Sequence, residues 1–420
     1  MSAAVSIADR ADWLADGHLQ RLLGVLCQGG EEARVAGGAV RNTLLGEAVS
    51  DIDIATTTTP GETTRRAEAA GFKAVPTGAE HGTITVVAGG RPFEVTTLRA
   101  DIETDGRRAK VTFGRDWKKD AERRDFTINA LFADAEGRVI DLVGGVADIE
   151  SRTLRFIGDA ETRIREDYLR ILRFFRFFAW YGTGRPDADG LKACARLKGG
   201  LDQLSAERVW MEMKKLLGAP DPSRALLWMR QSGVLGKVLP EGEKWGIDAI
   251  HGLVKTGADL GWAPDALLRL EALLPPDAGR AAGLAARLKL SRAETERLVA
   301  WASTPGVEPS SSERVLARML YRGDKQGFLD RLRLDFAAAR WRALQDDKAL
   351  VEAGGYSRLL GFAGKWEKPK FPLKGSDLLA LGVQSGPALG TMLLELEREW
   401  IEAGFKSDRA ALLARAAELL

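Results

Sequence analysis

The sequence predicts a mixed α/β head followed by a long all-helical region, because the residue pattern changes near residue 150. Before about residue 145, short β-type runs such as residues 52–55 alternate with helical ones. Residues 83–87 and 93–98 are rich in Thr, Val and other β-forming residues. Gly89 and Gly90 separate these two runs and can adopt the positive φ of a tight turn, which predicts a β-hairpin. These signals are absent from the rest of the chain, so the sheet is expected to be small and confined to the head.

Helical spacing dominates after residue 150, and residues 205–218 illustrate it. Ser205 can cap the helix, Gly218 can end it, and the apolar stripe between them consists of Val209, Met213, Leu216 and Leu217. Similar segments, separated by Pro and Gly turns, continue to the C-terminus. We therefore expect a head at residues 1–150, a helical neck at 151–217, a helical body at 218–305 and a helical tail at 306–420.

Composition excludes several classes of protein. The 420 residues carry a formal net charge of only +2, so binding to nucleic acid would require basic residues that are arranged locally. The two cysteines, Cys27 and Cys194, cannot build a disulfide framework or a thiolate zinc site, and they fit a reducing compartment. The most aromatic run, residues 174–180, is too short to cross a bilayer. We expect a cytoplasmic protein without a membrane partner.

A pair of carboxylates carries the strongest chemical signal. Asp51 and Asp53 are two residues apart, so in a strand they share one face while Ile52 and Ile54 point into the core. Mg²⁺ relieves the repulsion between such carboxylates, and it commonly uses one or two of them together with substrate phosphates. Glu94, on the neighbouring predicted strand, is a candidate third ligand.

A glycine pair lies just upstream of these carboxylates. Gly37 and Gly38 are expected to leave backbone amides open to a triphosphate, and Arg41 can add charge-assisted hydrogen bonds. A solvated Asp-x-Asp at a strand edge beside an ordinary glycine turn is the alternative interpretation. The combination of the two motifs favours a nucleotide site.

This combination resembles the nucleotidyltransferases related to DNA polymerase β, in particular the bacterial-type class II branch of tRNA CCA-adding enzymes and poly(A) polymerases. Further segments carry the resemblance in the same order: residues 123–130, with Arg124, Asp125 and Asn129 for the ribose; residues 141–145, the hinge; residues 166–173, which select the base; and residues 374–387 in the tail. The resemblance implies an α/β polymerase-β-like nucleotidyltransferase head with a small mixed sheet, followed by all-α neck, body and tail domains. It also implies Mg²⁺ as cofactor, CTP and ATP as substrates and the tRNA 3′ end as partner. The tail segment resembles a helix-hairpin-helix, although an ordinary helical turn is the alternative.

The base-selecting segment can also be argued from chemistry. On a helix, Asp167 and Arg170 would share one face, and together they offer an acceptor beside a donor. Cytosine and adenine present an amine next to a ring nitrogen acceptor and match this pair. Guanine and uracil present the opposite pattern, and each buried mismatch costs about 1–3 kcal/mol. The resemblance assigns nucleotide binding to Arg173 and Arg176 as well, but helical geometry keeps Arg173 near Arg170 and turns Arg176 away.

Two positions depart from the family pattern, since Asn42 replaces a usual Asp and Tyr168 replaces a usual Pro. Residues 55–60 lack the basic segment of the poly(A) polymerase branch, and residues 99–122 resemble the mobile loop of enzymes that complete CCA. We therefore predict addition of C, C and A to tRNA 3′ ends. A CC-adding enzyme or a poly(A) polymerase is the alternative within the family. A catalytically inactive RNA-binding protein is the alternative outside it.

Overall fold

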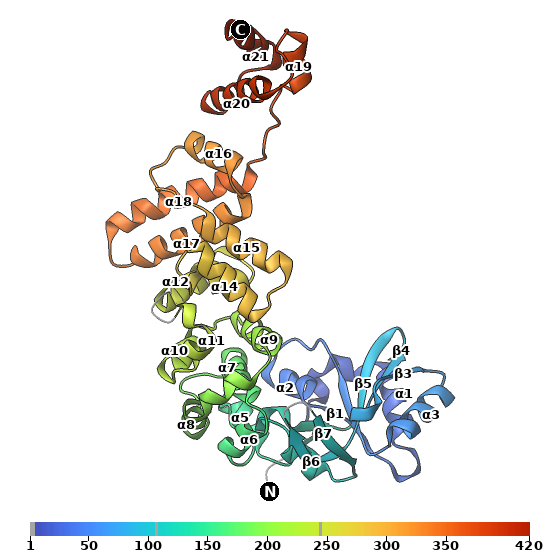
Figure 1. The fold of residues 1–420 in the computed structure, drawn as a ribbon. Coiled ribbons are helices and arrows are strands. Elements are labelled where there is room, and N and C mark those ends of the chain that lie inside the picture. Colours follow the sequence, from blue (N-terminus) through green and yellow to red (C-terminus); the bar gives the residue numbers. More distant parts are fainter. Residues whose placement is uncertain (1–4, 106–107, 243–245) are drawn as a thin grey trace. The chain divides into compact units, whose positions relative to one another are not determined.

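The computed structural model describes the chain except for residues 1–4, 106–107 and 243–245. The chain divides into two compact units, Met1–Pro240 and Glu241–Leu420 (Figure 1). The expected head and neck fall in the first unit and the expected tail in the second. This division separates residues 240 and 241, where the four-part prediction has no boundary, and the four-part organisation stays a prediction.

A mixed seven-stranded sheet organises the first part of unit 1, in the order β3-β4-β5-β2-β1-β8-β9. Its strands are β1 (Ala33–Ala36), β2 (Asp53–Thr56), β3 (Lys73–Gly78), β4 (Thr83–Ala88), β5 (Arg91–Thr97), β8 (Leu131–Ala133) and β9 (Val139–Asp141). Only β2 and β5 pair in parallel, and the other neighbours are antiparallel. A separate two-stranded sheet joins β6 (Arg99–Asp105) to β7 (Arg108–Phe113). The expected hairpin is confirmed as β4 and β5, with Gly89 and Gly90 at positive φ in the turn.

Helices α1 (Gly17–Leu26), α2 (Gly38–Leu45) and α3 (Pro60–Ala69) accompany the sheet, and α1 and α3 lie beside each other over β4 (Figure 1). One core cluster lies behind the central strands and includes Trp117 and Phe132, whose rings meet edge to face with centroids 5.0 Å apart. The burial of Ile52 and Ile54 anchors the segment that carries the carboxylate pair, as predicted. The burial of these two isoleucines therefore determines the direction of the polar side chains in the same segment.

The rest of unit 1 is helical. Its helices are α4 (Trp117–Glu122), α5 (Gly145–Glu150), α6 (Ala160–Glu166), α7 (Leu169–Tyr181), α8 (Ala188–Leu197), α9 (Ala206–Leu217), α10 (Ser223–Gln231) and α11 (Val234–Val238). Helix α7 packs against α9 and α10, and it buries the aromatic side chains of Phe174, Phe175 and Phe178. Helix α9 confirms the prediction for residues 205–218, with Ser205 at the N-cap position and the predicted apolar stripe buried. Of the arginines on α7, Arg173 pairs with Asp125 of the head, whereas Arg176 pairs with Glu212 of α9.

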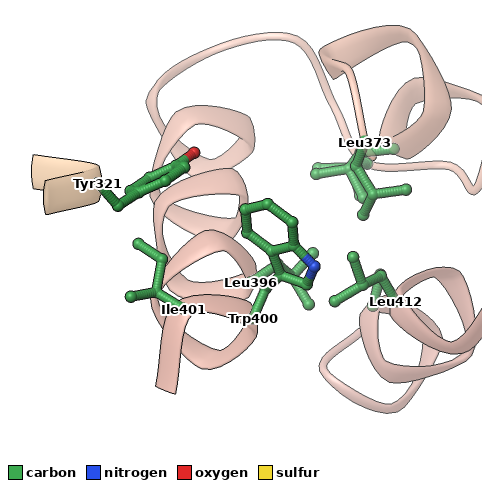
Figure 2. Close-up of a cluster of buried hydrophobic side chains, with 9 residues drawn as sticks. Tyr321, Leu373, Leu396, Trp400, Ile401 and Leu412 are labelled. Carbon is green, nitrogen blue, oxygen red and sulfur yellow. The ribbon is translucent and has the colours of Figure 1, made fainter. Parts of the chain in front are cut away.

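Unit 2 is helical throughout its described residues. Its helices are α12 (Ile247–Leu260), α13 (Ala266–Ala272), α14 (Ala278–Leu288), α15 (Arg292–Ser303), α16 (Glu313–Arg322), α17 (Lys325–Arg342), α18 (Asp347–Lys365), α19 (Gly375–Ala380), α20 (Pro387–Glu402) and α21 (Arg409–Glu418). Figure 2 shows the C-terminal core, in which Trp400 of α20 packs between Tyr321 of α16 and Leu412 of α21. Across the described part of the chain, no helix combines the length and apolarity that a membrane span needs.

Candidate active site

A cleft of about 610 Å³ in unit 1 gathers most of the residues singled out in the sequence. Its predicted members are Gly37, Gly38, Arg41, Asp53, Glu94, Arg124, Asp125, Asn129, Asp167, Arg170 and Arg173. These residues lie far apart in the sequence and reach the cleft from the sheet, from α2, from the segment that follows α4, and from α7 together with Asp167 before it. Within the described chain, the lining of this cleft does not include Asp51 or Arg176.

Asp53 and Glu94 lie side by side on the parallel strands β2 and β5, where their Cα atoms are register partners. The pKa of Asp53 is raised, first because the surrounding protein removes water from it and then because Glu94 and Asp51 are nearby like charges. The expectation that Asp51 belongs to the same strand is wrong, because β2 begins at Asp53 and Asp51 precedes it, exposed and hydrogen-bonded to the Ser50 hydroxyl at 2.9 Å.

This concentration of negative charge fits a divalent cation. Carboxylate oxygens are hard ligands, and a bound cation would relieve the repulsion from Glu94 and Asp51 that adds to the effect of desolvation on the pKa of Asp53. No set of three or more His, Cys, Asp or Glu side chains is arranged to hold a metal ion in the described part of the chain. The site therefore fits a cation that is held by few protein ligands and completed by substrate phosphates, which is a common arrangement for Mg²⁺.

Gly37 makes the sharp turn between β1 and α2. Its φ of 66° and ψ of −107° suit glycine, and a Cβ atom there would lie 3.2 Å from both Arg124 Nη1 and the Asn129 carbonyl oxygen. The expectation that both glycine amides stay open is wrong for Gly37, whose N–H donates to the Leu131 carbonyl at 2.8 Å. Gly38, the first residue of α2, lines the cleft, and the first turn of this helix has no side-chain cap among the described residues.

Arg41 lies at the back of the cleft in a dense set of hydrogen bonds. Its guanidinium donates to the side-chain oxygens of Asn42, at 2.9 Å, and of Asn129, and to the Tyr181 hydroxyl at 2.9 Å. Burial lowers the pKa of Arg41, and Tyr181 and Asp125 oppose that shift. Asn42, one of the departures from the family pattern, therefore keeps a structural role because it accepts from Arg41 and holds it in place.

The segment after α4 contributes a second set of polar groups. Asp125 is buried and accepts from the Asn129 amide at 3.0 Å and from the Arg173 guanidinium at 2.7 Å. Burial alone would raise the pKa of Asp125, but Arg173 and Asn129 outweigh it, and the pKa is lowered. Arg124 donates to the Asn129 carbonyl at 3.1 Å and pairs with Asp120 at 3.1 Å.

Asp167 and Arg170 both line the cleft, but the expectation that they share a helix face is wrong. Asp167 has an extended backbone between α6 and α7, and its side chain accepts from the Leu169 N–H at 3.0 Å, as an N-terminal cap does. Its second oxygen accepts from Arg208 at 2.6 Å. Arg170 pairs with Glu166 instead and donates to the Arg163 carbonyl at 2.9 Å. The acceptor and the donor therefore each have a separate protein partner.

Arg173 and Arg176 have different surroundings, as helical geometry predicts. Arg173 lines the cleft beside Asp125, whereas Arg176 pairs with the buried Glu212 of α9 at 2.8 Å. Although burial opposes it, Asp125 and Glu212 raise the pKa of Arg173. For Arg176 burial prevails, and its pKa is lowered despite Glu212.

Sequence reasoning missed several polar residues of the site. Asp120 is almost fully buried and pairs with both Arg123 and Arg124. Its spacing from Arg124, one helical turn, was an available signal. Arg208 had no such signal, because only the packing of α9 on α7 brings it to the cleft, and the same packing pairs Glu212 of α9 with Arg176 outside the lining of the cleft.

Comparison with protein families supports this description of the head. A family model described as the poly(A) polymerase head domain matches residues 33–155. A second model, described as a probable RNA- and SrmB-binding site of polymerase A, matches residues 186–245. The first match covers the strands and turns that carry most of the cleft.

Similarity to individual proteins extends over nearly the whole chain. The mitochondrial CCA tRNA nucleotidyltransferase 1 of Mus musculus is 34% identical over 402 residues, which is 94% of this chain and 89% of that protein. The CCA-adding enzyme of Streptococcus sanguinis is 32% identical over 92% of this chain and 93% of its own length. The crystal structure of the Bacillus stearothermophilus CCA-adding enzyme in complex with CTP aligns with a TM-score of 0.72 and 27% identity, covering 96% of each chain. The chain therefore belongs to the family of CCA tRNA nucleotidyltransferases, enzymes with a polymerase-β-like head and a helical body.

Proposed function

We propose that this protein adds C, C and A to the 3′ end of tRNA from CTP and ATP and releases pyrophosphate. The observation that carries the proposal is that one cleft unites the carboxylates of Asp53 and Glu94, the start of α2 with Arg41, the Asp125–Asn129 pair, and the separately held side chains of Asp167 and Arg170. Relatives named for this activity, one of them solved with CTP, support the same substrates.

Each part of the cleft has chemistry suited to one part of the substrate. The N-terminal turn of α2 and Arg41 supply donors for the triphosphate. Asp125 and Asn129 offer an acceptor and an amide for the ribose hydroxyls. Asp167 accepts from the amine of cytosine or adenine, and Arg170 donates to the adjacent ring nitrogen. Arg173 stabilises the charge of Asp125, while Arg176 acts through Glu212.

The family implies a divalent metal, and we propose that it is Mg²⁺, held by Asp53 and Asp51 with Glu94 as a further candidate ligand. When bound there, it would supply charge neutralisation at the phosphates and acidify the attacking hydroxyl. The donor set supports this choice, because carboxylate oxygens near substrate phosphates are the ligands that Mg²⁺ prefers. We also propose a cytoplasmic, reducing location, which suits two free cysteines.

The choice of CCA over poly(A) rests on residues 55–60. In this segment the Thr56 and Thr58 hydroxyls are buried 3.0 Å apart, and the Thr58 hydroxyl lies 2.7 Å from that of Thr63 on α3. These side chains face the interior, so this part of the head does not provide the basic surface that a poly(A) polymerase of this family typically carries.

Incubation with tRNA that lacks its 3′ end, with each labelled nucleotide alone and in combination, tests the proposal. We expect incorporation of C, followed by one A. A long A tail would support poly(A) polymerase, and C alone would support a CC-adding enzyme. No incorporation in the presence of Mg²⁺ would support the inactive RNA-binding alternative. The Arg170→Ala variant should lose discrimination against UTP and GTP more than it loses rate with CTP.

A further inference from the structure

One part of the cleft has no role in the nucleotide contacts proposed above. It is lined by Thr83 of β4, Thr96 of β5 and Arg99 of β6. In the sheet order β4-β5-β2-β1, the carboxylates of Asp53 and Glu94 stand on the two inner strands, so β1 and β4 flank them on opposite sides. The Thr83–Thr96 pair joins β4 to β5 and therefore lies away from the turn that leads from β1 into α2.

The geometry of the reaction assigns a substrate to that side of the carboxylates. In nucleotidyl transfer, the attacking and the leaving oxygens lie in line on opposite sides of the phosphorus atom. The start of α2 and Arg41 are proposed to hold the triphosphate, whose outer two phosphates leave as pyrophosphate. The attacking hydroxyl must then come from the side of β4, and it belongs to the 3′-terminal nucleotide of the RNA.

The two threonines of this region suit a ribose. Their hydroxyl oxygens lie 3.1 Å apart and form one hydrogen bond across the strands. Thr96 is two residues from Glu94 on β5, so both side chains occupy the same face of the sheet. Among the described residues neither hydroxyl has a second partner, so the pair keeps one O–H donor and several lone pairs. A ribose 2′-hydroxyl, which both donates and accepts, can use them.

Phe113 supplies an aromatic ring at the base of the β6–β7 ribbon. Its Cα is the register partner of Arg99, so the two side chains share one face of the ribbon. The ring lies against Gly82, the residue before Thr83, because a Cβ atom at Gly82 would come within 2.8 Å of it. Even so, 38% of Phe113 stays exposed. An exposed aromatic ring next to polar and basic groups is typical of surfaces on which an unpaired RNA base stacks.

We propose that Thr83, Thr96 and Phe113 bind the 3′-terminal nucleotide of the RNA, with Phe113 stacked on its base and the threonine pair bound to its 2′-hydroxyl. This inference rests on the proposed function and names residues for its second substrate. These contacts are made to the RNA, so their loss should impair use of the RNA end and leave binding of the incoming nucleotide intact.

Single-turnover addition of C tests the stacking contact, on tRNA lacking its 3′ end whose terminal nucleotide is either intact or abasic. The wild type should be about tenfold slower on the abasic RNA, since stacking of the base is lost. Phe113→Ala should be about tenfold slower on the intact RNA and should lose nothing further on the abasic one.

Two further variants separate stacking from simple packing of the ring. Phe113→Leu keeps an apolar contact with Gly82 and should resemble Phe113→Ala, whereas Phe113→Trp should resemble the wild type. Full activity of Phe113→Leu would overturn the stacking role. An equal loss on the intact and the abasic RNA in Phe113→Ala would overturn it as well.

Thr96→Val tests the hydroxyl pair, because it keeps the β-branched shape that suits a strand. Addition of C should be about fivefold slower than in the wild type on RNA that ends in a ribose, and equal to the wild type on RNA that ends in a 2′-deoxyribose. The matched control is Thr77→Val, since the Thr77 hydroxyl pairs with that of Thr85 at 2.8 Å and, within the described chain, neither residue lines the cleft. This control should equal the wild type on both RNAs. A loss of the same size on both RNAs in Thr96→Val would overturn the contact with the 2′-hydroxyl.

The steady-state KM for CTP should stay at the wild-type value in the Phe113 and Thr96 variants. A KM for CTP that rises about tenfold would assign these residues to the incoming nucleotide and overturn the inference. Failure of the wild-type protein to add C or A would refute the proposed function itself. Normal addition by the wild type, without the selective losses in these variants, would refute only this inference.

Discussion

Two clusters of carboxylates and arginines, one in each unit, differ in how far they are exposed to solvent. In the unit 1 cleft, Asp53 is exposed and Arg173 retains 31% of its side-chain exposure. In unit 2, Arg297 of α15 links Asp265, which precedes α13, to Asp330 of α17, and Asp330 is completely buried. The first cluster can be reached by a ligand, whereas the carboxylate of Asp330 is already occupied by protein.

The unit 2 cluster is satisfied by its own members, with one exception. Arg297 donates to Asp330 at 2.8 Å and to Asp265 at 2.6 Å, and Gln326 donates to Asp330 at 2.9 Å. The exception is Glu271 of α13, whose two oxygens are buried without a hydrogen-bond partner among the described residues. The comparison shows that buried charge alone does not identify a functional site. The cleft differs from a structural ion-pair network in two ways: a ligand can reach its side chains, and its carboxylates keep acceptor positions that no protein group fills.

The largest expected effect comes from removing a cleft carboxylate. Asp53→Asn should lower the rate of C addition by about a hundred- to a thousandfold, because it removes a proposed ligand of the metal that stabilises the charged phosphates. Single-turnover kinetics at saturating Mg²⁺ measure this effect. The melting temperature should not fall, because the surrounding protein and then the like charges of Glu94 and Asp51 raise the pKa of Asp53, so the folded protein disfavours its ionised form. A rate near that of the wild type would contradict the role of Asp53.

Those residues of the cleft that belong to local sequence motifs could be predicted from the sequence. The Asp-x-Asp segment, the glycine turn and the hairpin follow from residue type and spacing, so Asp53, Gly37 and Glu94 could be assigned to the cleft in advance. The partner of Asp167 could not, because it depends on how α9 packs against α7. Arg170 was paired with Asp167 by assuming a continuous helix, but the extended backbone at Asp167 directs the two side chains to different partners.

The unit 2 network was not predicted, since Asp265, Arg297 and Asp330 lie on separate segments and no motif connects them. Arg297→Ala should destabilise unit 2 by about 3–5 kcal/mol, because it leaves two carboxylates without their shared partner. Chemical denaturation followed by circular dichroism measures the loss. Base discrimination by the remaining folded protein should be unchanged. Altered base discrimination would contradict the conclusion that the unit 2 cluster has a purely structural role.

A smaller effect of opposite sign is expected for Glu271. Burial, and then the neighbouring Asp330, raise the pKa of Glu271 well above its usual range. The folded protein therefore keeps this proton at pH values where the unfolded chain has lost it, and stability falls as pH rises from the unfolded pKa to the folded one. Glu271→Gln removes this dependence and should stabilise the protein near neutral pH by about 1.4 kcal/mol per unit of pKa difference.

Thermal unfolding of Glu271→Gln and wild type between pH 4 and 8 tests the sign. The two curves should converge at the acid end and separate as pH rises. Separation at low pH instead would mean that Glu271 is ionised in the folded protein. Asp248→Asn, at an exposed residue of the same unit, is the control and should leave the pH profile unchanged.

The smallest expected effect tests a polar contact at the edge of an apolar core. The Tyr321 hydroxyl donates to Glu397 at 2.5 Å, and burial together with this carboxylate raises the pKa of Tyr321 to about 12. Tyr321→Phe keeps the ring against Trp400 but loses the hydrogen bond, so it should cost about 0.5–1.5 kcal/mol. The cost stays modest because Glu397 is only half-buried, and water can replace the lost donor. Denaturant titration measures it, with Tyr356→Phe as the control, since Tyr356 has no hydroxyl hydrogen bond within the described part of the chain. A loss of stability as large as that of Arg297→Ala would show that this contact matters as much as the buried ion pairs of Arg297. Equal stability of the two Phe variants would show that the Tyr321–Glu397 hydrogen bond contributes nothing to stability.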